Sequence, residues 1–245
     1  MGLHECVEGS MTGILAIETA TDACSVAVVV DGVCHTRHRV APRQHSQLLF
    51  GMLDDLLPGG NLAEQGIEMI AYGCGPGSFT GLRIAASAVQ GLAYSSKLPV
   101  VAVSTLAILA QTALRSGVVS GDALVLCTLD ARINEVYSAV FKFENATAVL
   151  KDGPWACSPG ELAPQGTESL FAVGSGCLFR EQFSQSLQAR IQSCDPEVLP
   201  AAQDIVPLAL VKYWLGEVQT PRNVQPVYLR DEISWKKLAD QGKRS

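Results

Sequence analysis

Apolar residues fall in short blocks along the start of the chain, and polar or glycine-containing turns separate the blocks. Residues 13–18 (GILAIE) and 24–30 (CSVAVVV) predict two buried strands. Asp31-Gly32 follows the second block and favours a two-residue hairpin, because glycine tolerates the positive φ of such turns. Residues 33–40 therefore predict the returning strand, so three antiparallel strands open the fold.

Helical spacing replaces strand spacing after residue 42. Residues 43–57 predict a helix that ends at Pro58, with apolar side chains at helical intervals: Leu49, Met52, Leu53 and Leu56. Residues 80–95 predict a second helix with an apolar stripe of its own: Leu82, Ala86, Val89 and Ala93. Residues 68–72 and 99–103 predict strands, and residues 104–115 predict a third helix. The order β-β-β-α-β-α-β-α is typical of a ribonuclease H-like unit, a mixed sheet covered by helices.

The rest of the chain predicts a second unit of the same kind. Strands are expected at 122–129, 135–143, 147–151 and 170–173, a loop at 152–166, and helices at 179–190 and 202–215. The sequence thus predicts an α/β fold of two ribonuclease H-like lobes. We expect an N-terminal lobe at 13–104, a C-terminal lobe at 105–220 and a tail at 221–245 that docks on the body.

Composition adds limits to this picture. The 245 residues carry a net charge of −6, with 48% hydrophobic and 17% charged residues. A sizeable core can form, and the acidic balance gives no general attraction to a phosphate backbone. Eight scattered cysteines without a C-x-x-C pair indicate reduced thiols, and no apolar stretch reaches the ~20 residues of a membrane span. These features predict a cytoplasmic protein without a membrane contact.

Two turns carry candidate chemistry. Glu18, Thr19, Thr21 and Asp22 follow the first strand, and such residues hold phosphate or hydrated magnesium in some enzymes, although Thr and Asp are also ordinary turn formers. A glycine-rich string leads from the fourth strand into a helix: Gly75, Pro76, Gly77, Ser78, Phe79, Thr80, Gly81, Leu82 and Arg83. It is neither a P-loop nor G-x-G-x-x-G, so by chemistry alone it predicts a tight turn with a Ser or Thr N-cap. The four histidines form no metalloprotease motif, and G-x-S-x-G is absent.

Together, four strings resemble the TsaB family, and the resemblance runs from about residue 13 to residue 238. The strings are residues 13–27, residues 73–83, residues 129–137 and residues 226–237. The resemblance implies the actin, sugar-kinase and Hsp70 superfamily, which agrees with two ribonuclease H-like lobes. It also implies a role in placing threonylcarbamoyl on tRNA adenosine, in complex with the catalytic paralogue TsaD and the ATPase TsaE. In that setting tRNA is reached only through the complex.

The resemblance also implies that this chain lacks the paralogue's chemistry. TsaD-like proteins carry a metal-binding H-x-x-x-H pair where this chain has Thr105 and Leu109, and neither suits iron or zinc. Their glycine-rich phosphate turn corresponds to Asp130-Ala131-Arg132-Ile133 here, where no glycine allows close backbone approach. We therefore expect no catalytic residue, no metal and no cofactor in the isolated chain. A nucleotide at the junction with TsaD and TsaE would contact Thr19, Thr21 and Gly77.

The resemblance further implies that two predicted helices form a surface for a partner protein. The family implies that its first two helices form a bundle with the same helices of TsaD, or of a second copy when the chain is alone. The predicted interface residues are Leu49, Met52, Leu53, Leu56, Leu82, Ala86, Val89 and Ala93. The alternative is that these side chains belong to the core of the chain itself.

Two enzymatic functions remain as alternatives to a scaffold. Glu18, Thr21 and Asp22 are compatible with an ATP-dependent kinase or transferase of the same superfamily, although the turn at Asp130 argues against it. A glycoprotease-like hydrolase is the other alternative, and the missing H-x-x-x-H pair argues against a metalloprotease.

Overall fold

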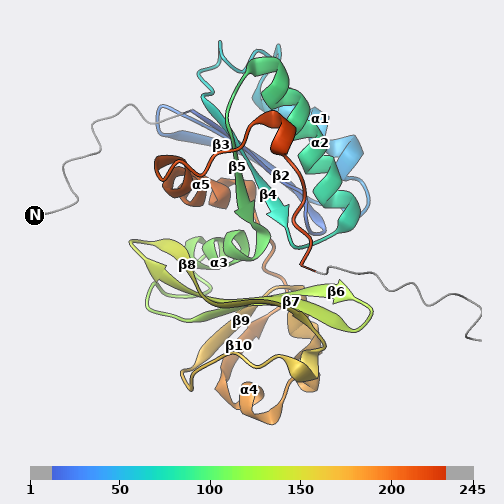
Figure 1. Ribbon diagram of the computed structural model, residues 1–245, viewed down its shortest axis with the longest axis vertical. Helices are drawn as coiled ribbons and strands as arrows, with labels where there is room; N and C mark the ends of the chain where they lie inside the picture. The colour runs from blue at the N-terminus through green and yellow to red at the C-terminus, as the bar shows by residue number, and fades with distance from the viewer. Residues whose placement is uncertain (1–12, 230–245) are drawn as a thin grey trace, which may run out of the picture.

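The computed structural model describes residues 13–229, and these residues form two five-stranded mixed sheets stacked along the long axis (Figure 1). The first sheet has the strand order β3-β2-β1-β4-β5. Its strands are β1 (Ile14–Glu18), β2 (Ala23–Val30), β3 (Val33–Val40), β4 (Met69–Gly75) and β5 (Val100–Ser104). β1 pairs antiparallel with β2 and parallel with β4, and β4 pairs parallel with β5.

The opening hairpin forms as predicted. Asp31 and Gly32 have φ angles of 50° and 77°, and Val30 pairs with Val33 across the turn. Positive φ at both central residues matches the twist of the flanking strands. β1 and β2 are buried almost throughout, whereas β3 is exposed along its whole length at the edge of the sheet.

Helices cover both faces of the first sheet. α1 (His45–Leu56) and α2 (Phe79–Ser96) lie on the outer face, where Leu15, Ile17, Ile70 and Tyr72 point toward them. α3 (Thr105–Arg115) and α5 (Ile205–Trp214) lie on the opposite face, between the two sheets (Figure 1). α5 contacts β1, β4 and β5, although it follows the second sheet along the chain.

The second sheet has the strand order β10-β9-β6-β7-β8. Its strands are β6 (Val125–Arg132), β7 (Glu135–Glu144), β8 (Thr147–Cys157), β9 (Leu170–Val173) and β10 (Ile191–Asp195). The 3₁₀ helices η1 (Pro159–Glu161) and η2 (Ser175–Gln182) and the short helix α4 (Gln185–Arg190) cover its outer face. The 3₁₀ helices η3 (Ala202–Asp204) and η4 (Pro221–Asn223) flank α5.

Residues of both sheets and of the two helices between them form one continuous core. Met69 and Val103 of the first sheet belong to the same buried cluster as Val125 and Phe141 of the second, and Leu106 of α3 lies in that cluster. The two predicted units therefore share apolar surface through α3 and α5 rather than meeting at a polar joint.

The predictions for the second sheet were wrong at three places. Residues 152–166 are not all loop, because β8 continues through Gly153 and Trp155 to Cys157 and still pairs with β7. Residues 179–190 are not one helix, because the extended residues Phe183 and Ser184 separate η2 from α4. Strand β10 was missed, since its alternation is weak in a partly exposed edge strand.

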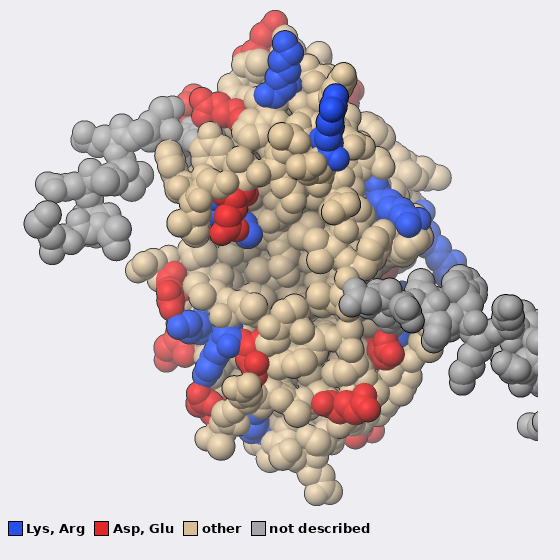
Figure 2. All heavy atoms as spheres, in the orientation of Figure 1, with Lys and Arg blue, Asp and Glu red and all other residues tan. Residues whose placement is uncertain are grey.

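The described part of the predicted tail lies against the first lobe. Val227 N donates to the carbonyl oxygen of Cys74 at 2.7 Å, and Tyr72 OH donates to the carbonyl oxygen of Gln225 at 3.0 Å. The predicted tail contacts at residues 234–237 lie outside the described residues. Figure 2 shows acidic and basic side chains interspersed on the viewed face, without a large block of one sign. Within residues 13–229, no helix is long and apolar enough to cross a membrane.

Candidate functional site

The glycine-rich string packs against the turn that follows β1. Ser78 N donates to the carbonyl oxygen of Ala20 at 2.7 Å, and Thr19 Oγ1 donates to the carbonyl oxygen of Gly81 at 2.8 Å. A β-carbon at Gly81 would overlap the Thr19 carbonyl oxygen, so only glycine allows this approach. The string thus joins α2 to the first turn of the sheet.

The end of the string starts α2 as the sequence predicts. Ser78 is the N-cap, and its side-chain oxygen accepts a hydrogen bond from Gly81 N at 3.3 Å. Gly75 and Pro76, at the start of the string, are buried. Phe79, Thr80 and Arg83 are exposed near the start of α2. The family string therefore divides into a buried structural part and an exposed part on the surface of α2.

The three residues predicted to contact a nucleotide differ in accessibility. Thr19 is fully buried, and its hydroxyl is already bonded to Gly81. Thr21 is half-buried and accepts a hydrogen bond from Ala23 N at 3.4 Å, and Gly77 is half-buried above Ala20. In this conformation a ligand can reach Thr21 and Gly77 but not Thr19. Nucleotide binding stays a prediction.

Glu18 is fully buried at the end of β1. Its side chain has no exposed surface, and its carboxylate lies against Gly73, where a β-carbon would overlap it. Burial raises the pKa of the Glu18 carboxyl from its ordinary 4.5 to about 7, although the N–H groups of Ala20 and Thr19 oppose the shift. Ala20 N donates to Oε1 at 2.5 Å, and Oε2 has no partner among the described residues.

The predicted interface residues lie mostly inside the chain. Seven of the eight are buried against the first sheet or between the helices, and Leu56 is half-buried. The buried seven are Leu49, Met52, Leu53, Leu82, Ala86, Val89 and Ala93. Any partner of α1 and α2 would therefore meet other side chains of these helices. Whether the two helices meet a partner stays a prediction.

The exposed face of the same two helices is rich in aromatic and small side chains. Phe50, Phe79 and Tyr94 are 60%, 49% and 72% exposed, which is unusual for large apolar residues. A shallow groove of about 500 Å³ lies between the helices. Its lining residues are Ser46, Phe50, Phe79, Thr80, Arg83, Ile84, Ser87 and Ala88. We name this surface the α1–α2 face.

The C-terminal segment completes one end of the α1–α2 face. The ring of Tyr228 lies 5.7 Å from the ring of Phe79, and the guanidinium carbon of Arg83 lies 3.5 Å from the Phe79 ring centroid. Arg83 Nε also donates to the Tyr228 hydroxyl at 3.2 Å. These contacts hold Phe79 and Arg83 in place while leaving part of both exposed.

Comparisons with known proteins identify the family. A family model described as "TsaD: tRNA N6-adenosine threonylcarbamoyltransferase" matches residues 33–189. The tRNA threonylcarbamoyladenosine biosynthesis protein TsaB of Escherichia coli is 37% identical, over 92% of this chain and 97% of that protein. This chain belongs to the TsaB family. The TsaB of Haemophilus influenzae is 33% identical, over 92% of this chain and 96% of that protein.

A solved structure supports the same assignment. "YeaZ from Pseudomonas aeruginosa" is 38% identical and superposes with a TM-score of 0.81, covering 89% of this chain and all of that one. The predicted α/β fold of two ribonuclease H-like lobes is confirmed in this TsaB-family chain, because each lobe is a five-stranded mixed sheet with helices on its faces.

The positions compared with the paralogue's metal ligands are closed in this TsaB-family chain. Thr105 and Leu109 are fully buried at the start of α3, and Thr105 Oγ1 has no partner within the described chain. Among residues 13–229, no cluster of three His, Cys, Asp or Glu side chains is placed to hold a metal ion. The turn at residues 130–133 folds on itself, because Arg132 N donates to Asp130 Oδ1 at 2.7 Å.

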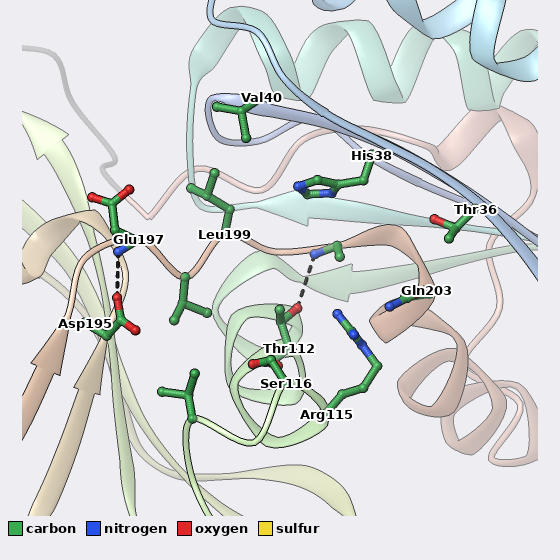
Figure 3. Close-up of a pocket in the computed structure, with 13 residues that line it drawn as sticks. Thr36, His38, Val40, Thr112, Arg115, Ser116, Asp195, Glu197, Leu199 and Gln203 are labelled. Carbon is green, nitrogen blue, oxygen red and sulfur yellow. Dashed lines mark hydrogen bonds between the residues drawn. The ribbon is translucent and has the colours of Figure 1, made fainter.

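A pocket of about 450 Å³ lies beside β3, the edge strand of the first sheet. The sequence analysis did not predict it. Thr36 and His38 of β3 face Thr112 and Arg115 of α3 across it, and Asp195 and Glu197 lie at its other end (Figure 3). Arg115 is bound to the buried carboxylate of Asp204 through contacts of 2.7 and 3.0 Å. The long sequence separation between β3 and α3 explains why spacing gave no signal for this pocket.

Proposed function

We propose that this chain acts in tRNA threonylcarbamoyladenosine biosynthesis as a non-catalytic subunit that pairs with and activates a TsaD-like catalytic partner. The relatives named TsaB place the family in that biosynthesis. The observation that carries the pairing is the α1–α2 face, where Phe50 and Phe79 stand exposed at a groove and Tyr94 stands exposed farther along α2.

The chemistry of this face fits a partner helix. Phe50 and Phe79 offer apolar area at the sides of the groove, and burying each such side chain is worth roughly 1.5–3 kcal/mol before the costs of association. Ser87, Ala88 and Gly91 keep the middle of α2 slim, and a β-carbon at Gly91 would meet nothing within 4 Å. Small residues in the middle and aromatic residues at the rim allow a helix to approach closely.

The surroundings of the superfamily's catalytic positions support a non-catalytic role. Glu18 and Thr19 are fully buried, and Thr105 and Leu109 are fully buried where the paralogue has its metal ligands. A kinase or transferase of this kind would need Glu18 open to its ligand, whereas only Thr21 and Asp22 of that turn reach the surface. A metalloprotease would need a histidine pair at the start of α3. The scaffold therefore fits these residues better than either enzymatic alternative.

The remaining assignments extend the same proposal. A TsaE-like ATPase would join the pair, and ATP would bind at the junction of the three chains rather than to this chain alone. With a net charge of −6, this chain would reach tRNA only through its partner. When no partner is present, the α1–α2 face would pair with a second copy of itself.

A reconstitution tests the proposal. The TsaD-like protein, the TsaE-like ATPase, ATP, threonylcarbamoyl-adenylate and tRNA are combined with and without this chain, and modified adenosine is measured by mass spectrometry. We expect modification only when the chain is present, and none from the chain with substrates alone. Equal modification without the chain would contradict the proposal, and modification by the chain alone would support an enzyme.

A further inference from the structure

Two cysteines of the second lobe lie together, away from the α1–α2 face. Cys177 lies in η2 and Cys194 in β10, 17 residues apart in the sequence. The Cys194 thiol donates a hydrogen bond of 3.9 Å to the carbonyl oxygen of Cys177, so the two residues are in contact. The fold, rather than a local C-x-x-C motif, brings the two cysteines together.

The two thiols have different surroundings. Cys177 is buried in the apolar cluster of the second lobe, whereas Cys194 is half-exposed at the edge of that cluster. The hydrogen bond from the Cys177 thiol lowers the pKa of Cys194, and the Arg180 guanidinium lowers it further. The same interaction, together with burial, raises the pKa of Cys177. Cys194 is thus the more readily ionised thiol and the one that solvent reaches.

We propose that Cys177 and Cys194 form a reversible oxidation site, at which a peroxide converts the two thiols into an intramolecular disulfide. Cys194 supplies the reacting thiolate, and Cys177 supplies the resolving thiol. The proposal concerns the second lobe alone and does not depend on the partner function.

The chemistry balances with hydrogen peroxide as the oxidant. The Cys194 thiolate attacks one peroxide oxygen, an S–O bond forms, the O–O bond breaks, and the departing hydroxide takes the Cys177 proton to give water. The Cys177 thiolate then attacks the Cys194 sulfenic acid, an S–S bond forms, and the S–O bond breaks. The second hydroxide takes up the proton that Cys194 released on ionisation. The two sulfurs lose two electrons, the peroxide oxygens gain two, and two waters form.

Cys34 provides an internal comparison. It is exposed on β3, but partial burial of its thiol, and then the nearby Asp204 carboxylate, raise its pKa. If exposure alone decided reactivity, Cys34 would react first. If the thiol pair decides it, Cys194 reacts first, by at least about tenfold in rate, because the thiolate is the nucleophile.

The test treats the full chain with stoichiometric hydrogen peroxide, blocks free thiols by alkylation and maps non-reduced tryptic peptides by mass spectrometry. We expect a cross-link between peptides 152–180 and 191–212, the loss of two alkylatable thiols, and recovery of both with dithiothreitol. Peptide 152–180 also contains Cys157. Cys157→Ser should therefore keep the cross-link, and Cys177→Ser should remove it and leave Cys194 as sulfenic acid.

Three outcomes would overturn the proposal. They are no cross-link in the wild-type chain under peroxide, a cross-link that survives Cys177→Ser, and oxidation of Cys34 ahead of Cys194. Because the cross-link is first sought in the wild-type chain, misfolding of a variant cannot hide it. Circular dichroism of the two serine variants checks that each comparison uses folded protein.

Discussion

At the scale of single residues, Glu18 has the environment least suited to its side chain. A carboxylate without exposed surface loses its hydration, and two backbone N–H groups replace only part of it. One oxygen, Oε2, stays without a partner among the described residues. The consequence is a carboxyl group that is about half protonated near pH 7 in the folded chain.

This environment predicts how stability depends on pH. The folded-state pKa of Glu18, about 7, exceeds the ordinary value of 4.5, so the folded chain binds the proton more tightly than the unfolded chain. The contribution to stability is therefore fully present below pH 4.5 and is lost as pH rises through 7, by at most about 3 kcal/mol.

Glu18→Gln removes the titrating group while keeping its shape. We expect urea unfolding of the variant to lose the downward slope between pH 4.5 and 7, and the variant to exceed the wild type in stability at pH 8. A wild-type chain with no such slope, or a variant that keeps it, would mean that Glu18 is hydrated or ion-paired in solution.

At the scale of elements, the apolar stripes of α1 and α2 decide which face is buried. Leu49 and Val89 have no exposed surface, because the α1 stripe packs on β2 and the α2 stripe packs on β4. The burial therefore supports the alternative that these predicted interface residues belong to the core of the chain itself. The exposed aromatic residues Phe50, Phe79 and Tyr94 fall outside the stripes, and that departure is the sequence signal that could have marked the α1–α2 face.

A charge placed in the α1 stripe should unfold the chain rather than only separate it from a partner. We expect Leu49→Asp to lower the free energy of unfolding by roughly 3–5 kcal/mol, since it removes apolar packing and buries an unpaired carboxylate. Gln47→Asp, two residues away on the exposed side of the same helix, should change it by about 0.5 kcal/mol or less. Urea unfolding followed by circular dichroism compares the two, and equal stabilities would place Leu49 on the surface.

The first lobe could be read from sequence because its strands and helices alternate with strong periodicity and clear turns. The strand at β3 and the helices α1 to α3 lie within a few residues of their predicted ends. The second lobe was harder for physical reasons. Ser184 caps a new helix inside the single helix predicted at 179–190, since its side chain accepts a hydrogen bond from Leu187 N. Trp155 continues a bulged strand beyond Gly153, where a loop was predicted. Burial of Thr19, and the meeting of Cys177 with Cys194, depend on contacts that spacing does not encode.

At the scale of the whole molecule, α3 and α5 join the two sheets into one body. Asp204 at the start of α5 accepts hydrogen bonds from Thr112 at 2.7 Å and from Arg115 at 2.7 and 3.0 Å, all from α3. The Asp204 side chain is 3% exposed, so these contacts satisfy a buried charge rather than a surface one.

Asp204→Ala should therefore destabilise the whole chain. We expect a loss of about 2–3 kcal/mol in one cooperative unfolding transition, because Thr112 and Arg115 lose their buried acceptor. Glu217→Ala, which removes the exposed pair with Lys212, is the matched control and should cost about 0–1 kcal/mol. Separate unfolding of the two lobes in the Asp204 variant would show that the shared core is weaker than the structure indicates.

The most direct test of the proposed pairing uses Gly91 of the α1–α2 face. A β-carbon at Gly91 would meet no atom of the described chain within 4 Å, so we expect Gly91→Leu to stabilise α2 by about 0.5–1 kcal/mol while filling the space that a partner helix would enter. Ala189→Leu on the exposed side of α4 is the control. Sedimentation of each variant with the TsaD-like protein should give affinity at least about tenfold weaker for Gly91→Leu and unchanged for Ala189→Leu. Wild-type affinity for a folded Gly91→Leu variant would contradict pairing through this face.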